Sequence, residues 1–583
     1  MSHLSASARV PSKTIFRSRF LLCAFVLSAV LKSLLAQDSP AKSPSTLLSV
    51  YARTVVEDVV VMDKNGRAVP NLRKQDFQIF ENGKPQTVTF FEPNFAAKET
   101  AVALPAALPP DTFTNVPPAP PNDVTNVLLL DALNTRSTER MFAQVQMVKY
   151  LASLPPNMRI AVFTLDNERF HLIWGFNQDS SALRAAIAKF TAKRSHSAPP
   201  SSDAQQRAEQ QELITSIGAW KQEANQARDD RLGESADALQ HFLSHGPGII
   251  YEYGNFFTTM SALEALAHYL AGIPGRKNLF WLAGTFPHQF KSGVYFDWYQ
   301  RAREKLAEAE VSVYPIDANG VDVDTGGFQS GGAISASSAR FENAEGWAEE
   351  TGGKAYHENN INQEIADAAD HGSLYYRLAY IPSDNKEEGR ERKIEVKVSS
   401  GDYKLFYRQR YFELTRKEIA KSEAAPAKDP FLGLMGRGMP NVSEIPYHLN
   451  VVLAVTQPGA GTPRAGQNAE LSGKLTRYSI GFRLLPGSLF LLPEADGSRR
   501  KSLQVLLMVF SQDGKPINWE SNTITLLVKP EKWAAEQKAG IAFRLEIDAP
   551  PGDIYLRTGV YDSSSSKVGT LEIPLSAVTI AQK

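Results

Sequence analysis

The chain has 583 residues, 43% of them hydrophobic, and its 63 basic side chains are balanced by 63 acidic ones. At roughly 150 residues per domain this length predicts about four domains, and the hydrophobic fraction is enough to build their cores. A nucleic-acid partner would require a strongly basic surface, so the neutral total argues against one.

The N-terminus has the pattern of a secretory signal. Four basic residues precede the apolar run 20-FLLCAFVLSAVL-31, and the small residue Ala36 follows it. The run is shorter than the ~20 residues that cross a bilayer, so residues 1–36 are predicted to be a signal peptide. We expect an exported protein in the periplasm, cell envelope or medium, with no stable membrane span after cleavage; an uncleaved anchor is the alternative. Cys23 is the only cysteine, so the mature chain lacks disulfides.

The first segment after the signal is β-rich. Residues 50–93 are predicted to form a small β module, in which 63-DKNG-66 ends one strand and 82-NG-83 makes a tight hairpin. Residues 94–123 are rich in Pro, Ala and Thr and are predicted to be an extended linker.

From residue 124 to 413 short apolar runs alternate with helical patterns. Continuous apolar runs are typical of strands buried on both faces, and their alternation with helices predicts a doubly wound, mainly parallel sheet. Strands are expected at 126–131, 159–166, 278–284 and 311–317, and helices at 141–154, 258–275, 296–310 and 343–353, the last ending at its glycines.

Two inserts interrupt this alternation. Residues 192–247 include a helical pattern whose Leu213, Ile217 and Trp220 share one face. We interpret it as a solvated insert packed by these three residues; a cover for the sheet rim or a docking face is the alternative. The Gly/Ser-rich segment 325–340 is predicted to be a mobile loop.

The remainder of the chain is β-rich. Antiparallel strands at 374–382, 392–398 and 403–412 either close the edge of the α/β domain or form an annex to it. A linker over 414–445 follows. Short strands at regular turn spacing then predict a β-sandwich-like domain over 446–580.

Several motifs occur in a fixed order between residue 50 and about residue 413. They are 59-VVVMDKNGRAVPNLRKQDFQIFENGKPQ-86, 131-DALNT-135, 270-LAGIPGRKNLFWLAGTFP-287, 313-VYPIDANG-320, 350-ETGGKAY-356, 375-YYRLAYIP-382 and 391-ERKIEVKV-398. In this order they resemble the bacterial von Willebrand factor A (vWA)-related proteins of the type common in acidobacteria. The resemblance implies a vWA-like fold, a central sheet with helices on both faces that grips another protein.

Metal-binding members of that family use an Asp-x-Ser-x-Ser turn after the first strand, a threonine in a later loop and an aspartate after the fourth strand. Here Asp131 takes the first position, Thr135 the second hydroxyl and Thr258 the loop position. Leu133 replaces the first serine, and 283-AGT-285 lacks the last aspartate. Mg²⁺ needs near-octahedral oxygen ligation at ~2.1 Å, so the resemblance implies a degenerate site of Asp131, Thr135 and Thr258 that at best holds Mg²⁺ or another divalent cation weakly.

Two other carboxylates end strands at the same rim; Asp317 is too distant to share one ion with Asp131, whereas Asp166 stays open as a substitute ligand. Asp317 is expected two strands from Asp131, ~10 Å away, whereas Asp166 is expected one strand away on the other side. We therefore predict no tight metal site and no certain cofactor, and Asp131 and Asn134 then cap the following helix. Ligands of open α/β sheets bind beyond the carboxyl ends of the strands. The expected rim residues are Asp131, Asn134, Thr135, Asp166, Thr258, Thr259 (the alternative loop threonine), Gly284 and Asp317.

No catalytic constellation stands out. The ten histidines contain no HExxH pair, Ser330 lacks the G-x-S-x-G spacing, and Gly352 and Gly353 end a helix instead of opening one. The sequence therefore predicts an exported, non-enzymatic adhesion or scaffold protein that binds a protein or cell-surface ligand at the rim. The alternatives are a substrate-recruiting subunit of an envelope hydrolase or other enzyme complex, and a purely structural envelope component.

Overall fold

The structure is a computed structural model. It describes residues 54–94, 108–116, 124–135, 160–166, 170–175, 203–227, 252–288, 294–318, 331–357, 361–384, 391–399, 401–412, 430–459, 461–489, 491–493, 496–563 and 565–578, with isolated positions at 145, 148, 151 and 185 and between 232 and 240. The signal peptide predicted over 1–36 lies outside these residues. No helix among the described residues is both long and apolar enough to cross a membrane.

The central sheet combines parallel and antiparallel strands. Its order is β10–β9–β6–β7–β8, in which β6 pairs in parallel with β7 and β9, β9 pairs in parallel with β10, and β8 joins β7 antiparallel. The first four predicted strands are confirmed, whereas β8 has no counterpart among the sequence expectations. The strands are β6 (Thr125–Asp131), β7 (Ile160–Leu165), β8 (Phe170–Trp174), β9 (Lys277–Ala283) and β10 (Val311–Asp317).

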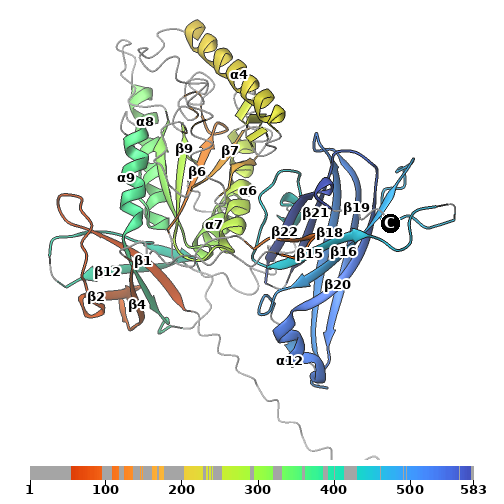
Figure 1. Ribbon diagram of the computed structural model, residues 1–583. Helices are drawn as coiled ribbons and strands as arrows, with labels where there is room; N and C mark the ends of the chain where they lie inside the picture. The colour runs from red at the N-terminus through yellow and green to blue at the C-terminus, as the bar shows by residue number, and fades with distance from the viewer. Residues whose placement is uncertain are drawn as a thin grey trace, which may run out of the picture. The chain divides into compact units, whose positions relative to one another are not determined.

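Helices cover both faces of this sheet (Figure 1). Side chains of a strand alternate between the faces, so Val127 and Leu129 enter one core while Leu128 and Leu130 enter the other. The first core is completed by α6 (Glu252–Ala271), α7 (Val294–Glu308) and α8 (Gly331–Thr351), and the second by α4 (Asp203–Gln226) and α9 (Ile361–Ser373).

The two predicted inserts have different outcomes. The helix expected in the first is α4, and its Leu213, Ile217 and Trp220 are buried in the second core. The loop predicted over 325–340 is wrong for residues 331–340, which form the first turns of α8. Alanine, the strongest helix former, recurs there every three residues and no proline interrupts the pattern. Residues 325–330 lie outside the described residues.

The strands at the two ends of the region 54–412 pair with one another. One sheet has the order β13–β1–β11–β4 and another the order β14–β12–β2–β3. Asn82 and Gly83 both have positive φ, 49° and 77°, which confirms the predicted tight hairpin. The elements are β1 (Val55–Met62), η1 (Lys74–Asp76), β2 (Phe77–Glu81), β3 (Lys84–Gln86), β4 (Val88–Asn94), β11 (Tyr375–Tyr380), β12 (Glu391–Val398), β13 (Lys404–Phe406) and β14 (Arg410–Phe412).

The C-terminal region contains two further sheets that share one apolar core. Their orders are β20–β16–β15–β5 and β17–β18–β21–β22, with β19 paired to β18. A strand from the predicted linker 94–123, β5 (Thr112–Thr114), pairs with β15. The other elements are α11 (Pro430–Gly433), β15 (Tyr447–Leu453), β16 (Thr476–Leu484), β17 (Leu492–Pro493), β18 (Arg499–Ser511), β19 (Pro516–Val528), α12 (Pro530–Ala539), β20 (Ile541–Ala549), β21 (Ile554–Asp562), β22 (Lys567–Pro574) and η3 (Leu575–Ala577).

Candidate functional site

The carboxyl ends of the parallel strands form one edge of the central sheet. Asp131 at the end of β6 lies opposite Ala283 at the end of β9, and Ala283 lies opposite Asp317 at the end of β10. On the other side Asp131 lies opposite Leu165, which Asp166 follows. Neighbouring strands are ~4.8 Å apart, so Asp131 and Asp317 are separated by two strand spacings, as the sequence predicts.

Asp131 is enclosed by hydrogen-bond donors. Its carboxylate is fully buried; Oδ1 accepts the backbone N–H of Asn134 at 3.0 Å, and Oδ2 accepts the Asn134 amide at 2.7 Å and the Trp281 indole N–H at 2.8 Å. A carboxylate has about four lone-pair positions, so at least three of them are used by the protein. The carboxylate therefore has little capacity left for a ligand from solvent.

Burial also sets the charge state of this residue. Loss of solvent raises the pKa of Asp131 to about 6, and the hydrogen bonds from Asn134 and Trp281 act in the opposite direction. At neutral pH the carboxylate is ionised but is stabilised only by neutral donors.

Asn134 connects the end of β6 to its neighbours. Its side-chain amide donates to Thr259 Oγ1 at 2.8 Å, and its backbone carbonyl accepts the N–H and hydroxyl of Thr285, both at 2.7 Å. Asp131 Oδ1 accepts the N–H three residues later, which is the contact made by a helix N-cap. The helix positions directly after Thr135 lie outside the described residues.

A hydrogen bond also joins Thr135, just after β6, to Gly284, just after β9. The Thr135 hydroxyl donates to the Asp131 carbonyl at 2.9 Å and accepts the Gly284 N–H at 3.0 Å. This hydroxyl is buried and uses its hydrogen-bonding capacity within the protein. The predicted neighbours Asp131, Asn134, Thr135, Thr259 and Gly284 therefore form one connected network.

The hydrogen bonds described above for the network do not include the remaining predicted residues. Thr258 is exposed, whereas Thr259 is fully buried and also donates to the Asn255 carbonyl at 2.8 Å. Asp166 and Asp317 are buried at the ends of their own strands, and no described hydrogen bond joins either carboxylate to Asp131.

Two residues that donate hydrogen bonds at this strand end, Trp281 and Asn255, were not predicted from the sequence. Trp281 is part of an apolar run, and its donor role depends on the alternation that places it on the same sheet face as the Asp131 side chain. Asn255 donates to the Leu133 carbonyl at 3.1 Å from the first turn of α6. Neither position carries a motif that could have identified it.

The described residues contain no group of three histidine, cysteine, aspartate or glutamate side chains that could hold a metal ion. Oxygen-only ligation by hydroxyls would be a different arrangement, but the hydroxyls of Thr135 and Thr259 are both used inside the network. The described arrangement is thus a hydrogen-bonded strand end in which the Asp131 carboxylate and the Thr135 and Thr259 hydroxyls are used within the protein.

The fold and this site define a mixed α/β protein with several sheets, one of which combines parallel and antiparallel strands. No protein-family model matches the chain, and no curated protein matches it. A solved structure with similarity to it is an aerotolerance-related membrane protein from Bacteroides fragilis NCTC 9343, with multiple mutations to serines. The match has 9% sequence identity and a TM-score of 0.22, and covers 42% of this chain and 98% of that one.

Proposed function

We propose that the chain is an exported, non-enzymatic adhesion or scaffold protein whose vWA-like domain binds a protein or cell-surface ligand at the edge defined by the ends of β6, β7, β9 and β10. The flanking β regions, the C-terminal one sandwich-like, act as spacers or secondary contacts in this proposal.

The strand order supports the proposal of a vWA-like domain. The central sheet has helices on both faces, and Asp131 ends the strand in its middle. Open α/β sheets bind their ligands beyond the carboxyl ends of the strands. The same edge carries the network of Asp131, Asn134 and Thr259.

The enclosure of Asp131 is the observation that carries the proposed mode of binding. A metal-dependent rim requires a carboxylate and hydroxyls that point to an ion, whereas this carboxylate faces three donors of its own protein. We therefore propose recognition without an intrinsic metal, through exposed groups around the network such as Thr258. A weak Mg²⁺ site is the alternative.

A capture experiment tests both the surface and the absence of metal. The purified protein is immobilised and exposed to envelope extract with either Mg²⁺ or EDTA. We expect the same partner in both conditions, its loss in Thr258→Arg, and its retention in Thr523→Arg, which places the same change on an exposed threonine of β19.

Capture that requires Mg²⁺ would contradict metal-free recognition, and so would a micromolar calorimetric response to Mg²⁺ that disappears in Asp131→Ala. Retention of the partner by Thr258→Arg would place the contact surface elsewhere. Reproducible turnover of ester or peptide substrates would favour the hydrolase-related alternative.

A further inference from the structure

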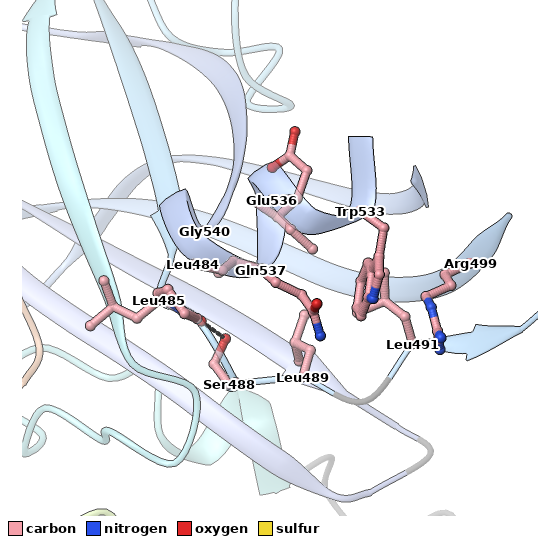
Figure 2. Close-up of a pocket in the computed structure, with 13 residues that line it drawn as sticks. Leu484, Leu485, Ser488, Leu489, Leu491, Arg499, Trp533, Glu536, Gln537 and Gly540 are labelled. Carbon is pink, nitrogen blue, oxygen red and sulfur yellow. Dashed lines mark hydrogen bonds between the residues drawn. The ribbon is translucent and has the colours of Figure 1, made fainter. Parts of the chain in front are cut away.

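The C-terminal region contains a pocket that the proposed function does not use. It has a volume of about 290 Å³ and lies between the end of β16 with its following loop, the start of β18, and α12. Its apolar lining includes Leu484, Leu489, Leu491 and Trp533 (Figure 2). A space of this size corresponds to roughly ten water-sized groups, at about 30 Å³ each.

The helix that borders the pocket, α12, buries none of its side chains against the sheet. A surface helix normally buries an apolar stripe, yet α12 has no buried residue, and Trp533 is its one large apolar side chain. In Figure 2 Gln537 points from α12 toward the loop that carries Ser488 and Leu489. Of the four apolar lining residues, Leu489 and Trp533 keep part of their surface exposed, where a ligand can contact it.

The position of α12 is fixed by close backbone contact. Gly540, which ends the helix, has a φ of 81°, and a Cβ added there would approach the Leu484 carbonyl oxygen to 2.2 Å. Only glycine fits at this point. The end of α12 that borders the pocket is therefore held against the end of β16.

One wall of the pocket carries a cation, Arg499, for which the described residues supply no acidic partner. The Arg499 guanidinium lies over the Trp533 ring, 4.5 Å from its centroid, and the part of the chain that the structure describes gives it no carboxylate. By contrast, Arg477, Arg392 and Arg408 each pair with a buried carboxylate. The carboxylate of Glu536 points away from Ser488 and Leu489 in Figure 2. An anionic group on a ligand would supply the missing partner.

We propose that this pocket binds a small apolar monocarboxylate of about ten non-hydrogen atoms, such as a medium-chain fatty acid. Its hydrocarbon part packs against Leu489 and Trp533, and its carboxylate accepts hydrogen bonds from Arg499. A guanidinium matches a carboxylate with two parallel hydrogen bonds. The assignment is independent of the function proposed for the strand edge.

Calorimetry of the full chain with octanoate, 1-octanol and octylamine tests the pocket and its charge. We expect octanoate to bind saturably with a Kd below about 1 mM. The Kd of 1-octanol should be at least about tenfold higher, because a charge-assisted hydrogen bond contributes a factor of ten or more to affinity. Octylamine, which carries a positive charge, should not bind. Arg499→Gln should weaken octanoate about tenfold and leave 1-octanol unchanged. Arg544→Gln, on an exposed position of β20, is the matched control and should bind octanoate normally.

A second variant tests the cavity without removing the charge. Leu489→Trp fills the space and should abolish octanoate binding while the circular dichroism spectrum and the Tm stay close to those of the wild type. Equal affinity for octanoate and 1-octanol, an unchanged affinity in Arg499→Gln or in folded Leu489→Trp, or no octanoate binding at all would overturn the proposal. Much tighter binding of an apolar peptide through its C-terminal carboxylate would also overturn it, because the occupant would then be a polypeptide end.

Discussion

The buried charge of Asp131 makes the stability of the protein depend on pH. Burial raises the pKa of this carboxyl to about 6 in the folded protein, whereas an aspartate in an unfolded chain titrates near about 3.9. The folded state therefore holds the proton more tightly. This stabilising contribution is complete below about pH 4 and is lost as the pH rises through about 6.

The Asp131→Asn variant has no carboxyl to titrate at this position, so it lacks this pH-dependent part of the stability. We expect the stability difference between wild type and variant to shift by up to about 3 kcal/mol in favour of the variant from pH 4 to pH 7, as measured by urea unfolding.

A second aspartate provides a control of opposite sign. The backbone N–H groups of Arg67 and Asn65 donate to the Asp63 carboxylate and hold its pKa below the ordinary value. Its stabilising contribution is present at neutral pH and is lost as the pH falls through the lowered pKa. The advantage of wild type over Asp63→Asn should therefore grow with pH. A pH-independent difference for Asp131→Asn would show that hydrogen bonds from Asn134 and Trp281 cancel the effect of burial.

The sequence contains enough information to choose between the two candidate threonines, Thr258 and Thr259. Both Thr258 and Thr259 fit the resemblance, but only Thr259 joins the network. Helical periodicity could have decided between them, because Thr259 lies three residues after buried Phe256 and four before buried Leu263. The role of Trp281 could not be deduced, since it requires knowing which strand is the neighbour of β6.

At the scale of elements, the chain directly after α8 passes so close to β10 that Gly353 has no room for a side chain. A Cβ added to Gly353 would lie 1.9 Å from the Val313 carbonyl oxygen of β10. This close approach lets Tyr356 pair with Ile316 directly after the helix. We expect Gly353→Ala to destabilise the protein by about 3 kcal/mol, the upper part of the range for overpacking, because the backbone of β10 or α8 must move. Chemical denaturation measures the loss.

The matched control is Gly433→Ala in α11. An added Cβ there meets nothing within 4 Å, and alanine favours a helix, so the variant should be as stable as the wild type or slightly more stable. If both variants unfold at the same denaturant concentration, the contact between Gly353 and β10 is looser in solution than described.

Elements were predictable where burial leaves a periodic signal. The four parallel strands are continuous apolar runs, and α4 displays three buried residues on one face. α12 buries no side chain, so its sequence carries no apolar stripe to detect. The short edge strand β8 is only partly buried, so its sequence also gives a weak periodic signal. Burial does not guarantee detection, because α9 was also missed although its Ile365 and Ala368 are buried in the second core.

At the scale of the whole molecule, long-range pairing was beyond local patterns. Composition and periodicity describe neighbours in sequence, whereas β1 pairs with β11 and β2 with β12 across the entire central α/β region. A buried cluster reinforces this pairing: Glu81 accepts hydrogen bonds from Arg392 at 2.7 Å, Tyr380 at 2.8 Å and Tyr411 at 2.7 Å. The glutamate and the arginine are 3% and 1% exposed, so the pair is held without competition from water.

This pairing predicts that the segment 54–94 stays bound after the chain is cut. A protease recognition sequence inserted between residues 95 and 107 should allow cleavage, yet both fragments should co-elute in size-exclusion chromatography, because their strands share sheets and a core. The same sample in concentrated guanidinium chloride should separate and provides the control. Adding Glu81→Ala leaves Arg392 buried without its partner, which costs about 3–5 kcal/mol, so the cut variant should release the segment at a lower denaturant concentration. Separation of the unsubstituted fragments in buffer would show that strands β1 to β4 form an independent unit.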